Sequence, residues 1–331
     1  MATGDKVVTL DGLKAVFDYQ EAEVSDLKSS LTHLCDPALA GYHNSIYRGK
    51  NITSYLTDGS LWKRLTGTGG YALFEDLYLG DYITVGSNSY EIADFDYYIR
   101  CGYSTAYNAD IQKHHVVMIP KAGMVIPEGT VLYGSTDTLQ FINTANAGVT
   151  VSSQETQNYF KWNATMEAPN DHTTNGGYKY SRMRTVIMKA ADTIVANAFG
   201  AAHLQKVAVM YPNPASESAS AFAGWAWFGI DDWSDPNRVS ICDLMNETQV
   251  YGQQVWGVWN TYNGFGYEVG IDKFQFALFA KHRNSADFRA SWWLRSVFSA
   301  TNAADVHNSG GANYVGSADA YAVRPRFLLV G

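Results

Sequence analysis

Cysteine, basic clusters and long apolar runs are all scarce in this 331-residue sequence, and each scarcity excludes a class of protein. The chain has 3 cysteines, which are too few and too widely spaced for a disulfide framework or a zinc knuckle: Cys35, Cys101 and Cys242. The net charge is −8 and no run rich in lysine and arginine occurs, which disfavours nucleic-acid binding. No apolar run reaches the length of a membrane span, so we expect no membrane insertion.

The N-terminus has no basic stretch followed by an apolar one, which predicts that the protein lacks a signal peptide and is made in a cytoplasm. Aromatic side chains, in contrast, are abundant at 14% of the residues. Tyrosine and tryptophan combine a large rigid surface with a polar group, which suits contact surfaces. A β-rich core filled with aromatic rings explains the excess equally well.

Residues 1–36 carry a heptad pattern with charged residues between the apolar positions. The repeating positions form two series: Leu10, Phe17, Val24 and Leu31, then Leu13, Gln20, Leu27 and Leu34. The pattern predicts a short coiled-coil helix that serves oligomerisation. So short a seam is unstable alone, so we expect a bundle of identical chains, three in number. An amphipathic helix packed on its own domain is the alternative. Residues 37–60 are polar and predict a linker or neck.

Residues 61–331 predict one mixed α+β unit. Two short strands around a turn are expected over 81–93, and a buried strand over 115–120. Apolar residues at three–four spacing predict a helix over 183–199 that closes at Gly200, and a second short helix is expected over 242–250. The C-terminal third is rich in glycine and aromatic residues, which predicts mainly loops.

No pattern typical of catalysis emerges. Gly67–Gly70 lacks the spacing of a phosphate-binding loop and predicts a turn. His114 and His115 adjoin in a strand, where they point to opposite faces, so we expect a structural role and not a metal site. Asp231, Asp232 and Asp235 lack the spacing of a calcium loop. We therefore expect no catalytic residue, no metal and no cofactor.

The end of the chain differs from the rest. Trp292–Ser296 is bulky and apolar with one embedded cation, and Val323–Val330 predicts a terminal strand. The residues between them, 297–322, are small or polar and predict an ordered loop. An ordered loop on a rigid scaffold is where binding residues usually lie.

Lys, Glu, Gln, Met and Trp are all missing from 296–323. An asparagine codon ends in a pyrimidine, and randomising its first two adenines produces none of those five. It readily produces Asn, Ser, Asp, Gly, Tyr, His, Phe and Val, which are frequent in this segment. The segment therefore fits adenine-directed mutagenesis, and the ordinary composition of a loop rich in Gly, Asn and Ser is the alternative.

Several segments, taken in order, resemble landmarks of the C-type-lectin-like variable proteins that gut bacteriophages diversify with diversity-generating retroelements. The resemblance covers about residue 60 to the end and rests on Gly80–Val85, His114–Pro120, Thr174–Ser181, Asn197–His203, Asp243–Gly252, Trp292–Ser296 and Val323–Phe327. It implies a C-type-lectin-like domain of the formylglycine-generating-enzyme-like type, without calcium, displayed as a trimer on a virion tip. The N-terminal helix also resembles the attachment region of phage tail or fibre proteins.

The resemblance further implies a variable region over about 285–327, with Trp292–Arg295 and Arg324–Phe327 as a fixed scaffold. Carried over by position, the exposed ligand-binding residues are Phe298, Ser299, Asp305, His307, Asn308, Ser309, Gly311, Asn313, Tyr314, Val315, Ser317, Asp319 and Tyr321. The implied partners are a protein or glycan receptor on a bacterial surface, further copies of this chain, and other phage tail proteins. The related enzymes need reactive cysteines, and no cysteine follows Cys242, which argues against enzymatic activity.

Two alternatives to host attachment stay open. One is an enzyme on the same fold, an oxidase or a glycan hydrolase that uses Asp231, Asp232 or Asp305; a hydrolase needs two suitably spaced carboxylates. The other is a purely structural subunit of a tail or fibre.

Overall fold

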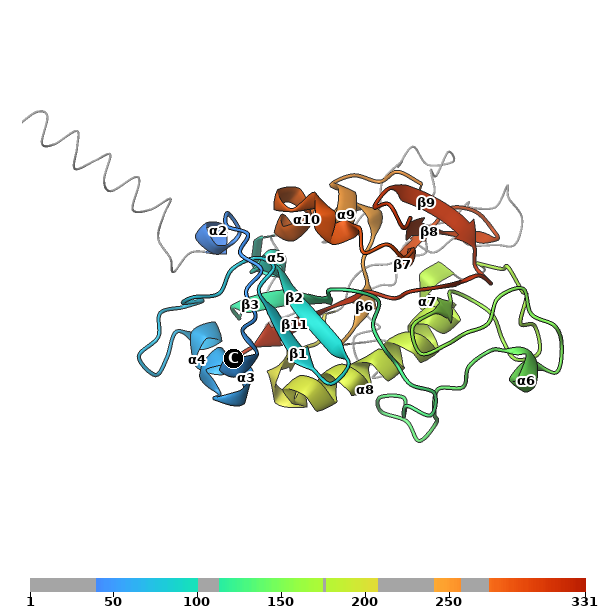
Figure 1. The fold of residues 1–331 in the computed structure, drawn as a ribbon, viewed down its shortest axis with the longest axis horizontal. Coiled ribbons are helices and arrows are strands. Elements are labelled where there is room, and N and C mark those ends of the chain that lie inside the picture. Colours follow the sequence, from blue (N-terminus) through green and yellow to red (C-terminus); the bar gives the residue numbers. More distant parts are fainter. Residues whose placement is uncertain (1–39, 101–112, 175–176, 208–240, 257–273) are drawn as a thin grey trace, which may run out of the picture.

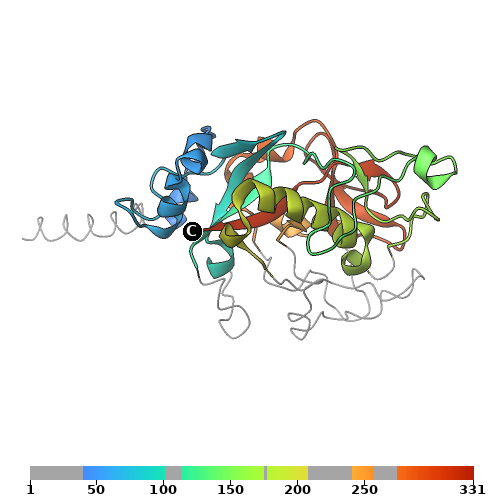
Figure 2. The same ribbon diagram turned by 90° about the horizontal axis from the view of Figure 1, so that it is seen from below.

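A computed structural model describes residues 40–100, 113–174, 177–207, 241–256 and 274–331. These residues form an α+β unit in which antiparallel sheets are accompanied by mostly short helices (Figures 1 and 2). The coiled-coil helix expected over 1–36 lies outside the described residues. None of the helices in the described part of the chain is long and apolar enough to cross a membrane.

The central sheet has six strands, and every pairing between them is antiparallel. Its order is β1-β2-β3-β11-β5, and β6 pairs with β11. The strands are β1 Tyr82–Val85, β2 Asn88–Phe95, β3 His115–Pro120, β5 Leu204–Gln205, β6 Asp243–Leu244 and β11 Pro325–Val330. The strands expected over 81–93 and 115–120 and the terminal strand are confirmed. Every residue of β3 and β11 is buried, as continuous apolar runs predict.

The long helix also forms as expected, with one difference. Residues Met183–Ile187 are a π-helix, and α8 Met188–Phe199 continues it to Gly200, where φ is +82°. The helix runs along one side of the central sheet (Figures 1 and 2), and Phe199 meets the ring of Phe327 there. Its buried Asp192 accepts the backbone N–H of Cys242 at 2.6 Å, which ties α8 to the start of β6.

The second expected helix is shorter than predicted. Residues 243–244 pair with β11, and α9 Glu247–Tyr251 begins only after Asn246. The side chain of Asn246 caps the helix by accepting the backbone N–H of Gln249, whose side chain accepts the N–H of Asn246 in return. Strand pairing therefore takes the first residues of the predicted helix.

The remaining helices have four to seven residues each in the described ranges. They are α2 Ala40–His43, α3 Thr53–Thr57, α4 Ser60–Thr66, α5 Tyr97–Arg100, α6 Thr144–Ala147, α7 Gly177–Tyr180 and α10 Ala277–Lys281, with 3-10 turns at Ala201–His203 and Arg283–Ala286. Gly67 ends α4 with φ +65°, in keeping with the predicted turn.

The described part of the predicted neck, residues 40–60, is packed onto the sheet. Ile52 and His43 are fully buried, and Tyr47 and Asn51 form parallel bridges to Leu79 and Tyr82. These residues belong to the folded unit, since buried apolar groups and backbone pairing hold them against β1. The sequence did not predict this, because their polar composition resembles that of a free linker.

The segment 297–322 is not the loop that its composition predicts. It contributes to a three-stranded antiparallel sheet of β7 Trp292–Val297, β8 Asn302–Val306 and β9 Ala312–Gly316. Strand β10 Ala320–Tyr321 then pairs with β4 Phe160–Lys161. Small side chains explain the difference, because Ala303 and Ala304 are fully buried in β8 and fill the interior without large apolar groups.

Candidate ligand-binding surface

The scaffold of the C-terminal sheet is held by tryptophans that are fully buried. The indole N–H of Trp292 donates to the carbonyl of Ala286 at 3.1 Å, and that of Trp293 donates to Phe160 at 2.7 Å. From the other side, Trp162 donates to the carbonyl of Leu294 at 3.0 Å. Each large ring is therefore fixed by a buried hydrogen bond as well as by packing.

Two buried arginines, one just before β11 and one within it, anchor this end of the chain to the central sheet. Arg324 donates to the carbonyl of Pro120 at 2.8 Å and forms an ion pair with Glu91 at 3.1 Å. Burial raises the pKa of Glu91 to about 7, against the attraction of Arg324. Arg326 pairs with Asp243 of β6 at 3.3 Å. Breaking a buried pair leaves an uncompensated charge, so these arginines hold β11 to its neighbours.

The register of the sheet places the predicted ligand-binding residues on two faces. Directly opposite residues share a face: Asp305 of β8 lies between Trp293 of β7 and Asn313 of β9. Ala304 lies opposite Tyr314, so Tyr314 points to the other face. We expected these positions to form one surface, but the alternation of side chains along a strand places them on opposite faces of the sheet.

Two members of the predicted exposed set are buried, which corrects that expectation. Asp305 is 0% exposed, and its Oδ2 accepts only a long 3.4 Å hydrogen bond from Asn313. Its Oδ1 has no partner in the described part of the chain, and burial raises the pKa of this carboxyl to about 7. Ser317 is also 0% exposed and donates to the carbonyl of Thr173 at 3.2 Å. Asp305 lies inside because β8 is the middle strand of this sheet. Ser317 lies inside in the turn between β9 and β10.

The turn between β8 and β9 carries the most exposed members of the set: His307, Asn308, Ser309 and Gly311. Two backbone hydrogen bonds of 2.8 Å close the turn, from His307 N–H to Gly311 and from Gly310 N–H to His307. Gly310 has φ +79°, which glycine adopts at no steric cost. The turn is fixed by its backbone, and its side chains point to solvent.

Phe298 and Tyr314 form an aromatic cluster with Trp256, a residue that the sequence did not single out. The rings of Phe298 and Tyr314 stack with centroids 3.9 Å apart, and Trp256 meets them edge-on at 5.7 and 4.9 Å. Tyr314 is 36% exposed. The aromatic run around 256–259 was visible in the sequence, but its proximity to residues about 40–60 positions later follows only from the fold.

The other predicted residues are partly buried: Ser299, Asn313, Val315, Asp319 and Tyr321. Tyr321 stacks on the scaffold residue Trp293 with centroids 5.1 Å apart. Ser299 accepts the backbone N–H of Asn302 at 3.1 Å and shapes the turn before β8. The structure thus gathers the predicted set around one small sheet, on both of its faces and its turns.

The residues considered for catalysis or metal binding do not assemble into a site in the described part of the chain. His115 is buried, and Asp96 accepts its backbone N–H at 2.9 Å while pairing with the ring of His114 at 2.7 Å. This is a structural arrangement at the start of β3. Among the described residues, no three histidine, cysteine or acidic side chains are grouped to hold a metal. Asp231, Asp232 and Asp235 lie outside the described residues.

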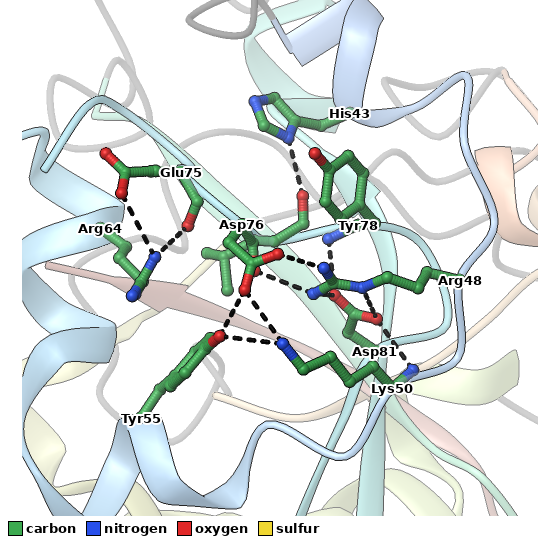
Figure 3. Close-up of polar contacts among 10 residues, drawn as sticks. His43, Arg48, Lys50, Tyr55, Arg64, Glu75, Asp76, Tyr78 and Asp81 are labelled. Carbon is green, nitrogen blue, oxygen red and sulfur yellow. Dashed lines mark hydrogen bonds and ion pairs between the residues drawn. The ribbon is translucent and has the colours of Figure 1, made fainter.

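A separate polar cluster of the described residues lies near α3, α4 and β1 (Figure 3). Asp81, whose side chain is fully buried, binds Arg48 at 2.6 Å and accepts the backbone N–H of Lys50 at 2.9 Å. Asp76 gathers Arg48, Lys50 and Tyr55, and these partners lower the pKa of its carboxyl. We call Arg48, Lys50, Tyr55, Asp76 and Asp81 the polar bracket, since they bind residues 48–55 to the segment before β1.

Comparison with known proteins gives no relative: no protein-family model, curated protein or solved structure matches the chain.

Proposed function

We propose that this chain is a receptor-binding protein that attaches a bacteriophage to a bacterial surface through the sheet β7–β9 and its turns. The observation that carries the proposal is the β8–β9 turn. The four residues there that the family resemblance assigned to ligand binding are exposed, and two backbone hydrogen bonds close the turn. A turn closed mainly by backbone hydrogen bonds depends little on its exposed side chains, which suits a diversified binding site.

The proposal includes a C-type-lectin-like fold of the formylglycine-generating-enzyme-like type. The α+β class, the antiparallel sheets and the arginine-anchored terminal strand are compatible with it. It also includes display on the virion as a homotrimer through residues 1–36, joined to other tail proteins. In Figure 1, α2 and the C-terminus lie well away from β8 and β9, so an attachment near residue 40 leaves the binding surface open to a host cell.

The enzyme alternative is disfavoured at the one candidate carboxylate that the structure describes. Asp305 is 0% exposed, so it does not reach a substrate as a general acid or nucleophile. We therefore propose that the protein is not an enzyme and uses no cofactor. A purely structural role is the remaining alternative, and it predicts no specific binding to any host cell.

The test is binding of the purified full-length chain to a panel of bacterial strains, with the double variant Tyr314→Ala/Tyr321→Ala as comparison. Specific binding by the wild type that falls at least 10-fold in the variant, while the variant stays folded, supports the proposal. Equal binding by the two places the receptor site elsewhere. Light scattering tests the trimer separately: a monomer contradicts the heptad argument, and a dimer contradicts only the number.

A further inference from the structure

Trp256 lies outside the segment that the sequence marks as variable, yet its ring contacts two predicted ligand-binding residues. Its centroid lies 5.7 Å from that of Phe298 and 4.9 Å from that of Tyr314. We propose that Trp256, Phe298 and Tyr314 form an aromatic platform that stacks against the pyranose ring of a neutral sugar in a bacterial surface polysaccharide. This inference rests on the proposed function and names the ligand class of the same surface.

The platform is positioned by the scaffold and not by its own rings alone. The buried carboxylate of Glu247 in α9 accepts the backbone N–H of Val255 at 3.1 Å and of Trp256 at 2.8 Å. Tyr314 lies in β9, whose pairing with β8 fixes its direction. Three aromatic side chains from separate segments therefore meet at one place before any ligand binds, which lowers the entropic cost of binding.

The three rings do not share one plane, so a sugar ring would stack on the exposed ring of the cluster, Tyr314, which Phe298 and Trp256 support. Phe298 and Tyr314 are inclined by only 27°, while Trp256 stands at 88° and 65° to them. Aromatic faces carry negative charge density, which attracts the polarised C–H groups on the apolar face of a sugar ring. With Tyr314 36% exposed, the cluster reaches the surface and is not merely core packing.

The exposed side chains of β8, β9 and the turn between them are neutral apart from His307. Asn302 lies on the same face as Tyr314, since both alternate with Asp305 and Asn313 in the paired strands. Between Ser296 and Ser317, Asp305 is the one acidic or basic side chain apart from His307, and it is buried on the other face. Hydroxyl and amide groups that offer both donors and acceptors match a polyhydroxylated, uncharged ligand. Among the described residues of these two strands and their turn, a protein receptor bound through charged groups would find only His307 as an exposed titratable partner.

The experiment measures binding of the full chain to strains that the wild type binds, after two treatments of the cells. Mild periodate cleaves bonds between adjacent hydroxyl-bearing carbons of sugars, and a broad-specificity protease removes surface proteins. We expect periodate to lower binding at least 10-fold and protease to change it less than 2-fold. Trp256→Ala should lower binding to untreated cells at least 10-fold, and Trp256→Phe, which keeps a flat ring, less than Trp256→Ala.

Tyr47→Ala is the matched control. Tyr47 is 38% exposed and stacks on His282 with centroids 3.9 Å apart, as Tyr314 does on Phe298, but it lies beside β1. The Tyr47→Ala variant should bind cells as strongly as the wild type. Should Trp256→Ala not fold, Tyr314→Ser at the exposed end of the platform takes its place. Loss of binding after protease but not periodate, or full binding by Trp256→Ala, overturns the sugar platform and leaves host attachment standing. A wild type that binds no strain overturns both.

Discussion

The polar bracket and the β8–β9 turn hold their side chains in opposite ways. In the bracket, side chains make the structure: Asp81 alone binds Arg48 and the backbone of Lys50 and Tyr78. In the turn, two backbone hydrogen bonds close the loop. The ring of His307 contacts Ser309 at both its hydroxyl and its backbone N–H, and Ser291 and Tyr251 from outside the turn bind the backbone of Asn308 and Gly310. The comparison teaches that a surface can change its side chains freely where they hold nothing in place. Four predictions test it, from the largest expected effect to the smallest.

The scaffold beneath the turn should be the most sensitive region. Trp293→Ala removes a fully buried ring and its hydrogen bond to Phe160. We expect the free energy of unfolding to fall by about 3–5 kcal/mol, because a large cavity forms where the ring packed. Urea unfolding followed by circular dichroism measures the change. A loss below about 1 kcal/mol would show that the sheet does not depend on this ring.

Asp305 should destabilise the fold as the pH rises. Its folded pKa is raised to about 7 by burial, above the ordinary value of 3.8. A carboxyl of this kind contributes stability below pH 4 that is lost as the pH rises towards 7, because only the unfolded chain releases the proton readily. Asp305→Asn keeps the shape without the charge, so it should be more stable than the wild type at pH 7.5, by at most about 4 kcal/mol. The difference should shrink towards pH 4, and thermal unfolding at several pH values measures it. A constant difference contradicts the assignment.

Removing a single charge from the polar bracket should lower the free energy of unfolding. Asp81→Asn leaves Arg48 without its buried partner, and we expect a loss of about 2–3 kcal/mol, reduced by the partial exposure of Arg48. Glu75→Gln is the matched control, since Glu75 is 46% exposed and lies 3.9 Å from Arg64. It should cost less than about 1 kcal/mol. Equal effects in the two variants would remove the distinction between a buried bracket and surface charge.

Substitutions of exposed side chains in the β8–β9 turn should change the stability of the fold very little. Asn308→Ala and Ser309→Ala change exposed side chains, and we expect the free energy of unfolding to shift by less than about 0.5 kcal/mol. Gly310→Ala is the internal contrast, because a side chain at φ +79° is strained. A large loss in Asn308→Ala, measured by the same urea unfolding, would mean that side chains shape the turn after all.

The sequence predicted much of the central sheet and the long helix but missed both the C-terminal sheet and the polar bracket, for physical reasons. Apolar periodicity predicted β2, β3, the terminal strand and α8, because the spacing of their apolar residues matches the side that each element buries. It did not predict β8 and β9, because alanine and glycine carry too weak an apolar pattern to separate a strand from a loop. The polar bracket was missed for a different reason: its charged residues lie about 30 positions apart in the sequence, as Arg48 and Asp81 do, so no local pattern pairs them.

The candidate site was predicted as a list of positions but not as a surface. Asp305 lies inside because β8 is the middle strand of the sheet and is buried on both faces, whereas Tyr314 in the edge strand β9 is exposed; the sequence alone does not give that strand order. Trp256 reaches the site through α9 and the carboxylate of Glu247, a contact between segments that no local pattern shows.

The most direct test of the account is a library in which His307, Asn308, Ser309, Asn313 and Tyr314 are varied together in the full chain. Each member is assayed for thermal unfolding and for the bacterial strains that it binds. The account predicts that most members unfold within a few degrees of the wild type and that different members bind different strains. A library whose members all bind the strains of the wild type, or mostly fail to fold, would contradict it.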